Sequence, residues 1–284
     1  MANTALVWIR DDFRIQNNDA LTYATNQHDA VTAVFIFNSN IFDHKREAQK
    51  WWVSKSLENF KSDLKKLNIG LEIIKDDEIN FFSKIKSKSK ISVYWNKVYE
   101  PNELEKDKKI GTDFSKKNID FKFFKGNVLN EYNKITKNDG TPFKVYSPFW
   151  RNAEQFYLER LPDKINKVKK CKKINTLFKN QIKSEDILPK SDWYKKFEKY
   201  WEPSEQKAHE NLDNFVNKSI LSYGVDRDFP SIKGTSLLSP YIRNGQINVG
   251  DIWQKCKKLK SNNVSIKKYT NEIGWREFSH SLIN

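Results

Sequence analysis

The sequence predicts an α/β fold: a doubly wound, parallel sheet of five strands, followed by a linker and the start of an all-helical domain. Over the first 125 residues, short apolar stretches alternate with helical patterns, as in strand–helix–strand units. From residue 204 onward only helical spacing recurs. We therefore expect an α/β domain over residues 1–128, a linker over 129–200, and part of a helical domain over 201–284.

The five expected strands are rich in apolar, β-branched and aromatic residues, and they cover residues 5–9, 31–37, 71–74, 91–95 and 121–124. The expected helices between them cover residues 19–27, 48–67, 79–86 and 102–117. Gly70 follows the second helix, where a glycine commonly ends a helix. In a parallel sheet of this kind, ligands bind beyond the carboxyl ends of the strands.

The segment after the first strand, "VWIRDDFRIQNN", has no glycine-rich dinucleotide motif, and the chain has no Walker A motif. The sheet is therefore Rossmann-like in architecture only. Residues 126–200 are turn-rich, then aromatic, then rich in lysine, which is typical of a connecting segment. The later helices are expected over residues 208–216, 239–245, 249–259 and 265–284.

Length and composition exclude several classes of protein. The chain has 284 residues, and no apolar run approaches the roughly 18 to 20 residues of a membrane span. Its start lacks the basic segment and apolar core of a secretory signal. Cys171 and Cys256 are too few for a disulfide framework or a metal cluster. We expect a cytoplasmic monomer that does not bind membranes.

The formal net charge of +15 suggests a polyanionic partner such as nucleic acid. However, of the 51 basic residues only 8 are arginine, which leaves 51 − 8 = 43 lysines, and an AT-rich genome produces such a bias without selection for binding. The lysine run over residues 164–183 is therefore interpreted as a solvated face. Where lysine is the default cation, an arginine suggests a bidentate contact, and six arginines fall in motif-like stretches: Arg10, Arg14, Arg151, Arg227, Arg243 and Arg276.

The stretch "YGVDRDFPSIKGTSLLSPYIRNG" carries the first candidate site. Thr235 and Ser236 follow a glycine in a flexible turn, and Ser239 with Pro240 is suited to begin a helix, with Ser239 as the N-cap. Hydroxyls beside the N-terminus of a helix favour a phosphate or diphosphate. An ordinary capped loop explains the same spacing equally well.

The stretch "EIGWREF" is the second candidate. Helical spacing places Glu272, Trp275 and Arg276 on one face. A carboxyl group beside an indole ring can hydrogen-bond a base while the ring stacks on it, and such stacking contributes about 1–3 kcal/mol per base. The simpler interpretation is an amphipathic helix with one ion pair between Glu272 and Arg276, worth about 0.3–0.5 kcal/mol.

The third candidate is "VYWNKVYEPNELEKDKKI". Asn102 and Glu103 open a helix directly after a strand, at the carboxyl edge of the expected sheet. A small molecule could bind there. Helix-start chemistry alone is the alternative.

Together these stretches resemble the DNA photolyase/cryptochrome family, and within it the class I cyclobutane-dimer photolyases. The resemblance spans essentially the whole chain, through five stretches in the family's order: "ALVWIRDDFR…NNDAL", "REAQKWWVSKSL", "GTPFKVYSPFWR", "RDFP…GTSLLSPYIRNGQI" and "EIGWREF". Each is weak alone, but five in the correct order are highly specific. The resemblance implies an α/β antenna domain joined to a helical domain that holds a U-shaped FAD.

By matching motif positions, the resemblance implies FAD contacts from nine residues: Tyr223, Thr235, Ser236, Leu237, Leu238, Ser239, Tyr269, Glu272 and Arg276. Trp275 would stack on a flipped-out pyrimidine dimer, Glu272 would hydrogen-bond its base, and Arg227 would contact the DNA backbone. Asn102 and Glu103 match positions that bind a 5,10-methenyltetrahydrofolate antenna, and His44 lies in a loop that could cover the same pocket.

The implied activity is that of a deoxyribodipyrimidine photo-lyase, a carbon–carbon lyase that repairs DNA containing pyrimidine dimers by light-driven electron transfer from reduced FAD. Two alternatives stay open: a cryptochrome-type photoreceptor, and a stand-alone module that binds folate or a nucleotide. The sequence also leaves open whether the antenna is a folate or a deazaflavin, and whether the lesion is a cyclobutane dimer or a (6-4) product.

Three departures from the family pattern stand out. Asn17 replaces the usual aspartate of the turn after the first strand, and Leu237 replaces a frequent arginine. Family chains also continue well beyond "WREF", whereas this chain ends inside an expected helix without a stop signal. We expect either a fragment or a natural truncation, the former favoured, which alone would bind FAD poorly and repair nothing.

Overall fold

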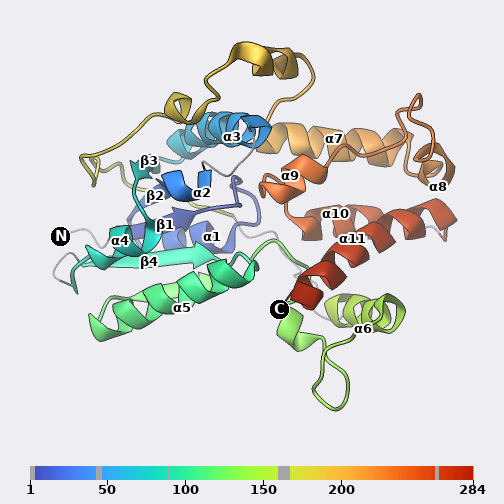
Figure 1. Ribbon diagram of the computed structural model, residues 1–284, viewed down its shortest axis with the longest axis horizontal. Coiled ribbons are helices and arrows are strands. Elements are labelled where there is room, and N and C mark those ends of the chain that lie inside the picture. The colour runs from blue at the N-terminus through green and yellow to red at the C-terminus, as the bar shows by residue number, and fades with distance from the viewer. Residues whose placement is uncertain (1–3, 43–46, 88–89, 159–166, 260–261, 284) are drawn as a thin grey trace.

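The computed structural model describes residues 4–42, 47–87, 90–158, 167–259 and 262–283, with a parallel sheet at one side and most helices of the second half of the chain at the other (Figure 1). The sheet order is β3-β2-β1-β4-β5 and every neighbouring pair is parallel. The strands are β1 (Thr4–Ile9), β2 (Ala30–Phe37), β3 (Gly70–Lys75), β4 (Ile91–Asn96) and β5 (Phe121–Phe124). The predicted five-stranded, doubly wound sheet is confirmed.

Helices cover both faces of this sheet, and they are α1 (Asp19–Gln27), α2 (Ser39–Phe42), α3 (Glu47–Lys66), α4 (Glu78–Ser83) and α5 (Pro101–Lys116). Successive side chains of a strand point to opposite faces. Accordingly, Val7 packs with the apolar side chains of α1 and α3, whereas Leu6 and Trp8 pack with those of α4 and α5. The one-turn helix α2 was not expected from the sequence.

The second half of the chain contains α6 (Tyr146–Leu158), α7 (Glu205–Lys218), α8 (Tyr223–Asp226), α9 (Ser239–Arg243), α10 (Val249–Lys257) and α11 (Val264–Ile283). The sequence patterns did not predict α6, because residues 126–200 were interpreted as a connecting segment. Pro148 lies in its first turn. A proline is tolerated in the first turn of a helix, however, and α6 packs its Trp150 edge-on against Trp253 of α10 at 5.3 Å. After α6 the chain returns to the sheet, where the Glu72 carboxylate accepts hydrogen bonds from the backbone N–H groups of Leu177 and Phe178.

The loop after β1, residues 10–18, joins the sheet to the helices. Arg14 is 2% exposed, and its guanidinium donates to the carbonyl of Gly245, 2.9 Å away, and to that of Asn17. Glu205 at the start of α7 accepts from the backbone N–H groups of Ile15 and Gln16. These contacts connect segments about two hundred residues apart.

The same loop explains the departure at position 17. Asn17 adopts a left-handed backbone (φ 50°), which asparagine tolerates, and its side-chain amide donates to the partly buried carboxylate of Asp251 on α10. An aspartate here would set two carboxylates against each other. The amide is therefore matched to its partner in this chain.

No helix of the described residues is long and apolar enough to cross a membrane.

Replacing Asn17 by aspartate should lower the free energy of unfolding by about 1–3 kcal/mol, because a donor to a partly buried carboxylate becomes a like charge. Urea denaturation at neutral pH measures this. Asn118→Asp is the matched control, since Asn118 has nearly the same backbone (φ 52°) but is exposed. Equal stability of both variants would contradict the account.

Candidate functional site

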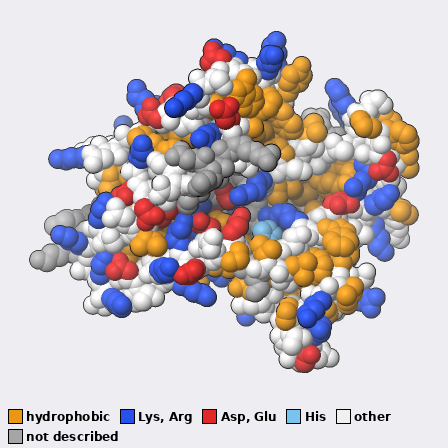
Figure 2. All heavy atoms as spheres, in the orientation of Figure 1, with side chains coloured by type: hydrophobic (Ala, Val, Ile, Leu, Met, Phe, Trp, Pro, Cys, Tyr) orange, Lys and Arg blue, Asp and Glu red, His pale blue; other side chains and the backbone are white. Residues whose placement is uncertain are grey.

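A cavity of about 690 Å³ lies between the sheet and the helices. The loop after β4, helices α8 and α9 with the turn before α9, and α11 supply its walls. Figure 2 shows hydrophobic and basic side chains around a recess in this part of the molecule. The cavity therefore combines apolar surface with charge, which is typical of a cofactor site.

Eight of the nine residues expected to contact FAD line this cavity: Tyr223, Thr235, Ser236, Leu237, Ser239, Tyr269, Glu272 and Arg276. The ninth, Leu238, does not; it is 1% exposed and packs in the helical core. Leu237 has a left-handed backbone (φ 54°) and is 56% exposed at the cavity. This strained turn directs one leucine outward and the next inward.

The hydroxyl groups of Thr235 and Ser239 make no hydrogen bond with the described part of the chain, so they are available to a ligand. The expectation that Ser239 would be an N-cap is wrong: α9 begins at Ser239, Leu238 occupies the cap position, and no side chain caps the helix. Because α9 has only five residues, its dipole adds little. Polar recognition at this wall therefore rests on the hydroxyls.

The charged residues of α11 are paired differently from the expectation. Glu272 accepts from Arg227 and does not pair with Arg276, and Arg227 also donates to the hydroxyl of Tyr223 at 3.0 Å. The predicted ion pair within the helix is thus wrong, because Glu272 pairs with Arg227, at the end of α8, instead. Glu272 and the proposed DNA contact Arg227 lie together at the cavity edge.

Arg276 instead lies 3.5 Å from Glu277. Its Nη1 atom is buried and has no hydrogen-bond partner within the described residues. Burial lowers the pKa of Arg276, an effect that Glu277 opposes. A partly buried cation with an unused donor beside a cavity fits an anionic or hydrogen-bond-accepting ligand, such as the diphosphate or ring system of a flavin dinucleotide.

Glu277 is a residue that sequence reasoning missed. Its side chain is 2% exposed and accepts from the backbone N–H groups of Leu129 and Asn130, at 2.9 and 3.0 Å. Burial raises the pKa of Glu277, and Arg276 and these two N–H groups oppose that effect. The contact holds α11 to the segment after β5. No local pattern could indicate it, because its partners are backbone groups far away in sequence.

Trp275 lies outside the cavity lining. Its indole is 48% exposed and stacks on the ring of Tyr146, with centroids 3.8 Å apart and planes inclined by 8°. Trp275 is nevertheless three residues from Glu272 on α11, so the two side chains flank the same edge of the cavity.

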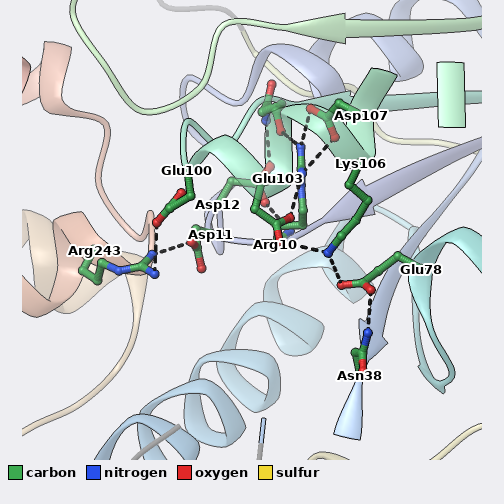
Figure 3. Close-up of polar contacts among 11 residues, drawn as sticks. Arg10, Asp11, Asp12, Asn38, Glu78, Glu100, Glu103, Lys106, Asp107 and Arg243 are labelled. Atoms are coloured by element: carbon green, nitrogen blue, oxygen red, sulfur yellow. Dashed lines mark hydrogen bonds and ion pairs between the residues drawn. The ribbon is translucent and has the colours of Figure 1, made fainter. Parts of the chain in front are cut away.

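A second cavity of about 430 Å³ lies at the carboxyl edge of the sheet, and Asn102 and Glu103 line it. Figure 3 shows the charge network in its wall. Arg10 forks onto Asp107, with N–O distances of 3.0 and 3.2 Å, and also reaches Glu103. Lys106 joins Glu103 to Glu78. The Glu103 carboxylate is therefore already neutralised, whereas Asn102 is exposed at the rim.

Arg243 stands between the two cavities. It pairs with Asp11 and, at 3.5 Å, with Glu100, and all three side chains line both cavities (Figure 3). The bidentate contact suggested by the rarity of arginine thus occurs at Arg10, whereas Arg243 bridges two different carboxylates. His44, expected near the smaller cavity, lies outside the described residues. No cluster of three or more metal-ligating side chains occurs within the described ranges.

Comparisons with known proteins all find photolyases and cryptochromes. A family model described as DNA photolyase matches residues 5–167. A deoxyribodipyrimidine photo-lyase of Agrobacterium fabrum is 30% identical, over 98% of this chain and 58% of that protein. Cryptochrome-1 of Arabidopsis thaliana is 23% identical, over 98% of this chain and 43% of its own length.

Among solved structures, a bacterial class III photolyase from Agrobacterium tumefaciens superposes with a TM-score of 0.88 at 29% identity. The match covers 100% of this chain and 59% of that one. The chain thus spans less than two thirds of the length of each of these relatives.

His280, at the cavity end of α11, should make stability depend on pH. Burial, and then the charges of Arg276 and Arg243, lower the pKa of His280 to about 4, below its ordinary value of 6.5. A lowered folded-state pKa stabilises the fold above about pH 6.5, and that contribution is lost as the pH falls toward 4. From about pH 7 to pH 5, we expect the free energy of unfolding to fall by about 2 kcal/mol through this group.

Urea denaturation at several pH values measures the effect. His280→Gln should flatten the curve over this range because the glutamine does not titrate. Parallel curves for the wild type and the variant would contradict the assignment.

Proposed function

Since the chain belongs to the DNA photolyase/cryptochrome family, we propose that it supplies part of a light-dependent enzyme that splits cyclobutane pyrimidine dimers in DNA. The observation that carries the proposal is the convergence of two distant segments on one cavity. Hydroxyl groups of Thr235, Ser236 and Ser239 meet Arg276 of α11 there. This donor set suits the diphosphate of FAD.

When bound, FAD supplies the photoexcited electron donor that the reaction requires. Around it, Thr235 and Ser239 donate hydrogen bonds through hydroxyls that have no partner in the described chain. Arg276 contributes a partly buried positive charge. Tyr223 and Tyr269, whose rings meet edge to face at 5.1 Å, close the apolar side.

Side chains at the edge of the cavity recognise the substrate. The half-exposed indole of Trp275 offers a stacking surface for an extruded base, and Glu272 offers an acceptor for its hydrogen-bonding edge. Arg227, which pairs with Glu272, supplies a positive charge at this edge for a phosphate of the DNA backbone. Together, these three side chains bind the damaged DNA.

The class of photolyase differs from our first expectation. The sequence motifs suggested class I, whereas the likeness at 29% identity is to a class III photolyase. We propose class III on this ground. For the smaller cavity we propose an antenna chromophore, a folate or a deazaflavin, with Asn102 at the rim as a contact. Glu103 would join only by sharing its pairs with Arg10 and Lys106.

A cryptochrome-type photoreceptor is the second candidate, favoured by the likeness to cryptochrome-1. The joint exposure of Trp275 and Glu272 favours repair, because both side chains have a role on a dimer.

Glu272→Gln should slow dimer repair about tenfold, since the carboxylate acceptor for the base is lost. The measurement is the loss of thymine dimers from an oligonucleotide under blue light, with the natural protein at its full length. The control is Glu105→Gln, an exposed glutamate of α5, which should repair at the wild-type rate. Repair by Glu272→Gln at the wild-type rate would contradict the role of Glu272, and no light-dependent repair by the wild type would contradict the function.

A further inference from the structure

The stack of Tyr146 and Trp275 has the shortest centroid distance, 3.8 Å, of the ring pairs among the described residues. Nearly parallel rings at this distance leave no room for a third ring between them. One face of the Trp275 indole is therefore occupied by the protein itself. Only the other face is open to a ligand.

We propose that Tyr146 is a positioning residue for Trp275: it covers one face of the indole and thereby presents the opposite face to an extruded base. This inference rests on the proposed function. It assigns a role to a side chain of α6, a helix none of whose residues is in the cavity lining described above.

Tyr146 is itself held in place. Its hydroxyl donates to the carbonyl of Asn271 at 3.0 Å, and the indole N–H of Trp150, one turn further along α6, donates to the side chain of Asn271 at 3.1 Å. Gly274 allows this close approach: a Cβ atom there would lie 2.6 Å from Trp150 and 2.7 Å from the Tyr146 hydroxyl. Figure 1 shows α6 beside α11, in agreement with these contacts.

The geometry of α11 indicates which face of the indole is covered. The residues of α11 that line the cavity include Ile273, Arg276 and His280, which share one side of the helix. Phe278 lies on the opposite side, and its ring contacts both Tyr146 and Trp275 edge-on at 6.0 Å. Tyr146 thus approaches Trp275 from the side away from the cavity.

The benefit for binding is a matter of entropy. A half-exposed tryptophan that moved among rotamers would lose that freedom when a base stacked on it. Because Tyr146 and Phe278 already fix the ring, the base meets a surface that is ordered before binding. Removing the stack should therefore weaken binding of the dimer without changing which groups touch it.

The test is a double-mutant cycle on binding of a single-stranded oligonucleotide with one thymine dimer, measured by fluorescence anisotropy with the natural protein at its full length. Tyr146→Leu removes the stack and keeps an apolar side chain, and we expect about 2- to 10-fold weaker binding. Tyr146→Phe, the matched control, keeps the stack and should bind as the wild type does. In the Trp275→Leu background, Tyr146→Leu should have no further effect.

Two results would overturn the inference alone: Tyr146→Leu binding as tightly as Tyr146→Phe, or an equal loss on adding Tyr146→Leu in the presence and absence of Trp275. In both, the wild type prefers the dimer and Trp275→Leu weakens binding. A wild type that binds damaged and undamaged oligonucleotides equally would instead overturn the proposed function, and the inference with it.

Discussion

The guanidinium of Arg14 joins the two halves of the molecule. It is almost fully buried, and within the described residues its hydrogen bonds go to the carbonyls of Asn17 and Gly245. Gly245 has a left-handed backbone (φ 65°), and a Cβ atom there would lie 1.8 Å from the carbonyl oxygen of Asp11. The turn after α9 can therefore dock on the loop after β1 only with glycine at this position. Since the hydroxyls of Thr235 and Ser239 lie just before this turn, the docking also fixes one wall of the larger cavity.

Carboxylates also join distant segments, by accepting hydrogen bonds from backbone N–H groups. Glu72, Glu205 and Glu277 each accept from two consecutive N–H groups of a segment distant in sequence. Such charge-assisted hydrogen bonds are stronger than neutral ones, and they satisfy donors in segments that have no regular secondary structure. Glu277 has a second consequence, because it lies next to Arg276 and holds α11 against the segment after β5. The position of a proposed flavin contact thus depends on a residue that touches no ligand.

The sequence predicted the sheet well because buried strands and their helices have strong, local patterns. Motif positions, and not local physics, also identified residues between 223 and 276 that converge on one cavity. The rest depended on contacts between distant segments. Glu272 pairs with Arg227 and not with its helical neighbour Arg276, because α8 ends beside α11. Two consecutive leucines do not indicate the left-handed backbone of Leu237, which directs Leu238 into the core. Helix α6 was missed because the turn-rich and lysine-rich residues around it are typical of a connecting segment.

If the proposed function holds, the flavin site is the cavity with the free hydroxyls and with the Nη1 atom of Arg276, which has no hydrogen-bond partner within the described residues. Equilibrium binding of FAD to the natural protein, freed of cofactor and compared with its Arg276→Met variant, tests this most directly. Methionine keeps an unbranched apolar side chain but removes the positive charge and its donors. We predict one FAD per chain for the wild type and an affinity about tenfold or more lower for the variant. Equal affinity for FAD in the two proteins would contradict the assignment of this cavity.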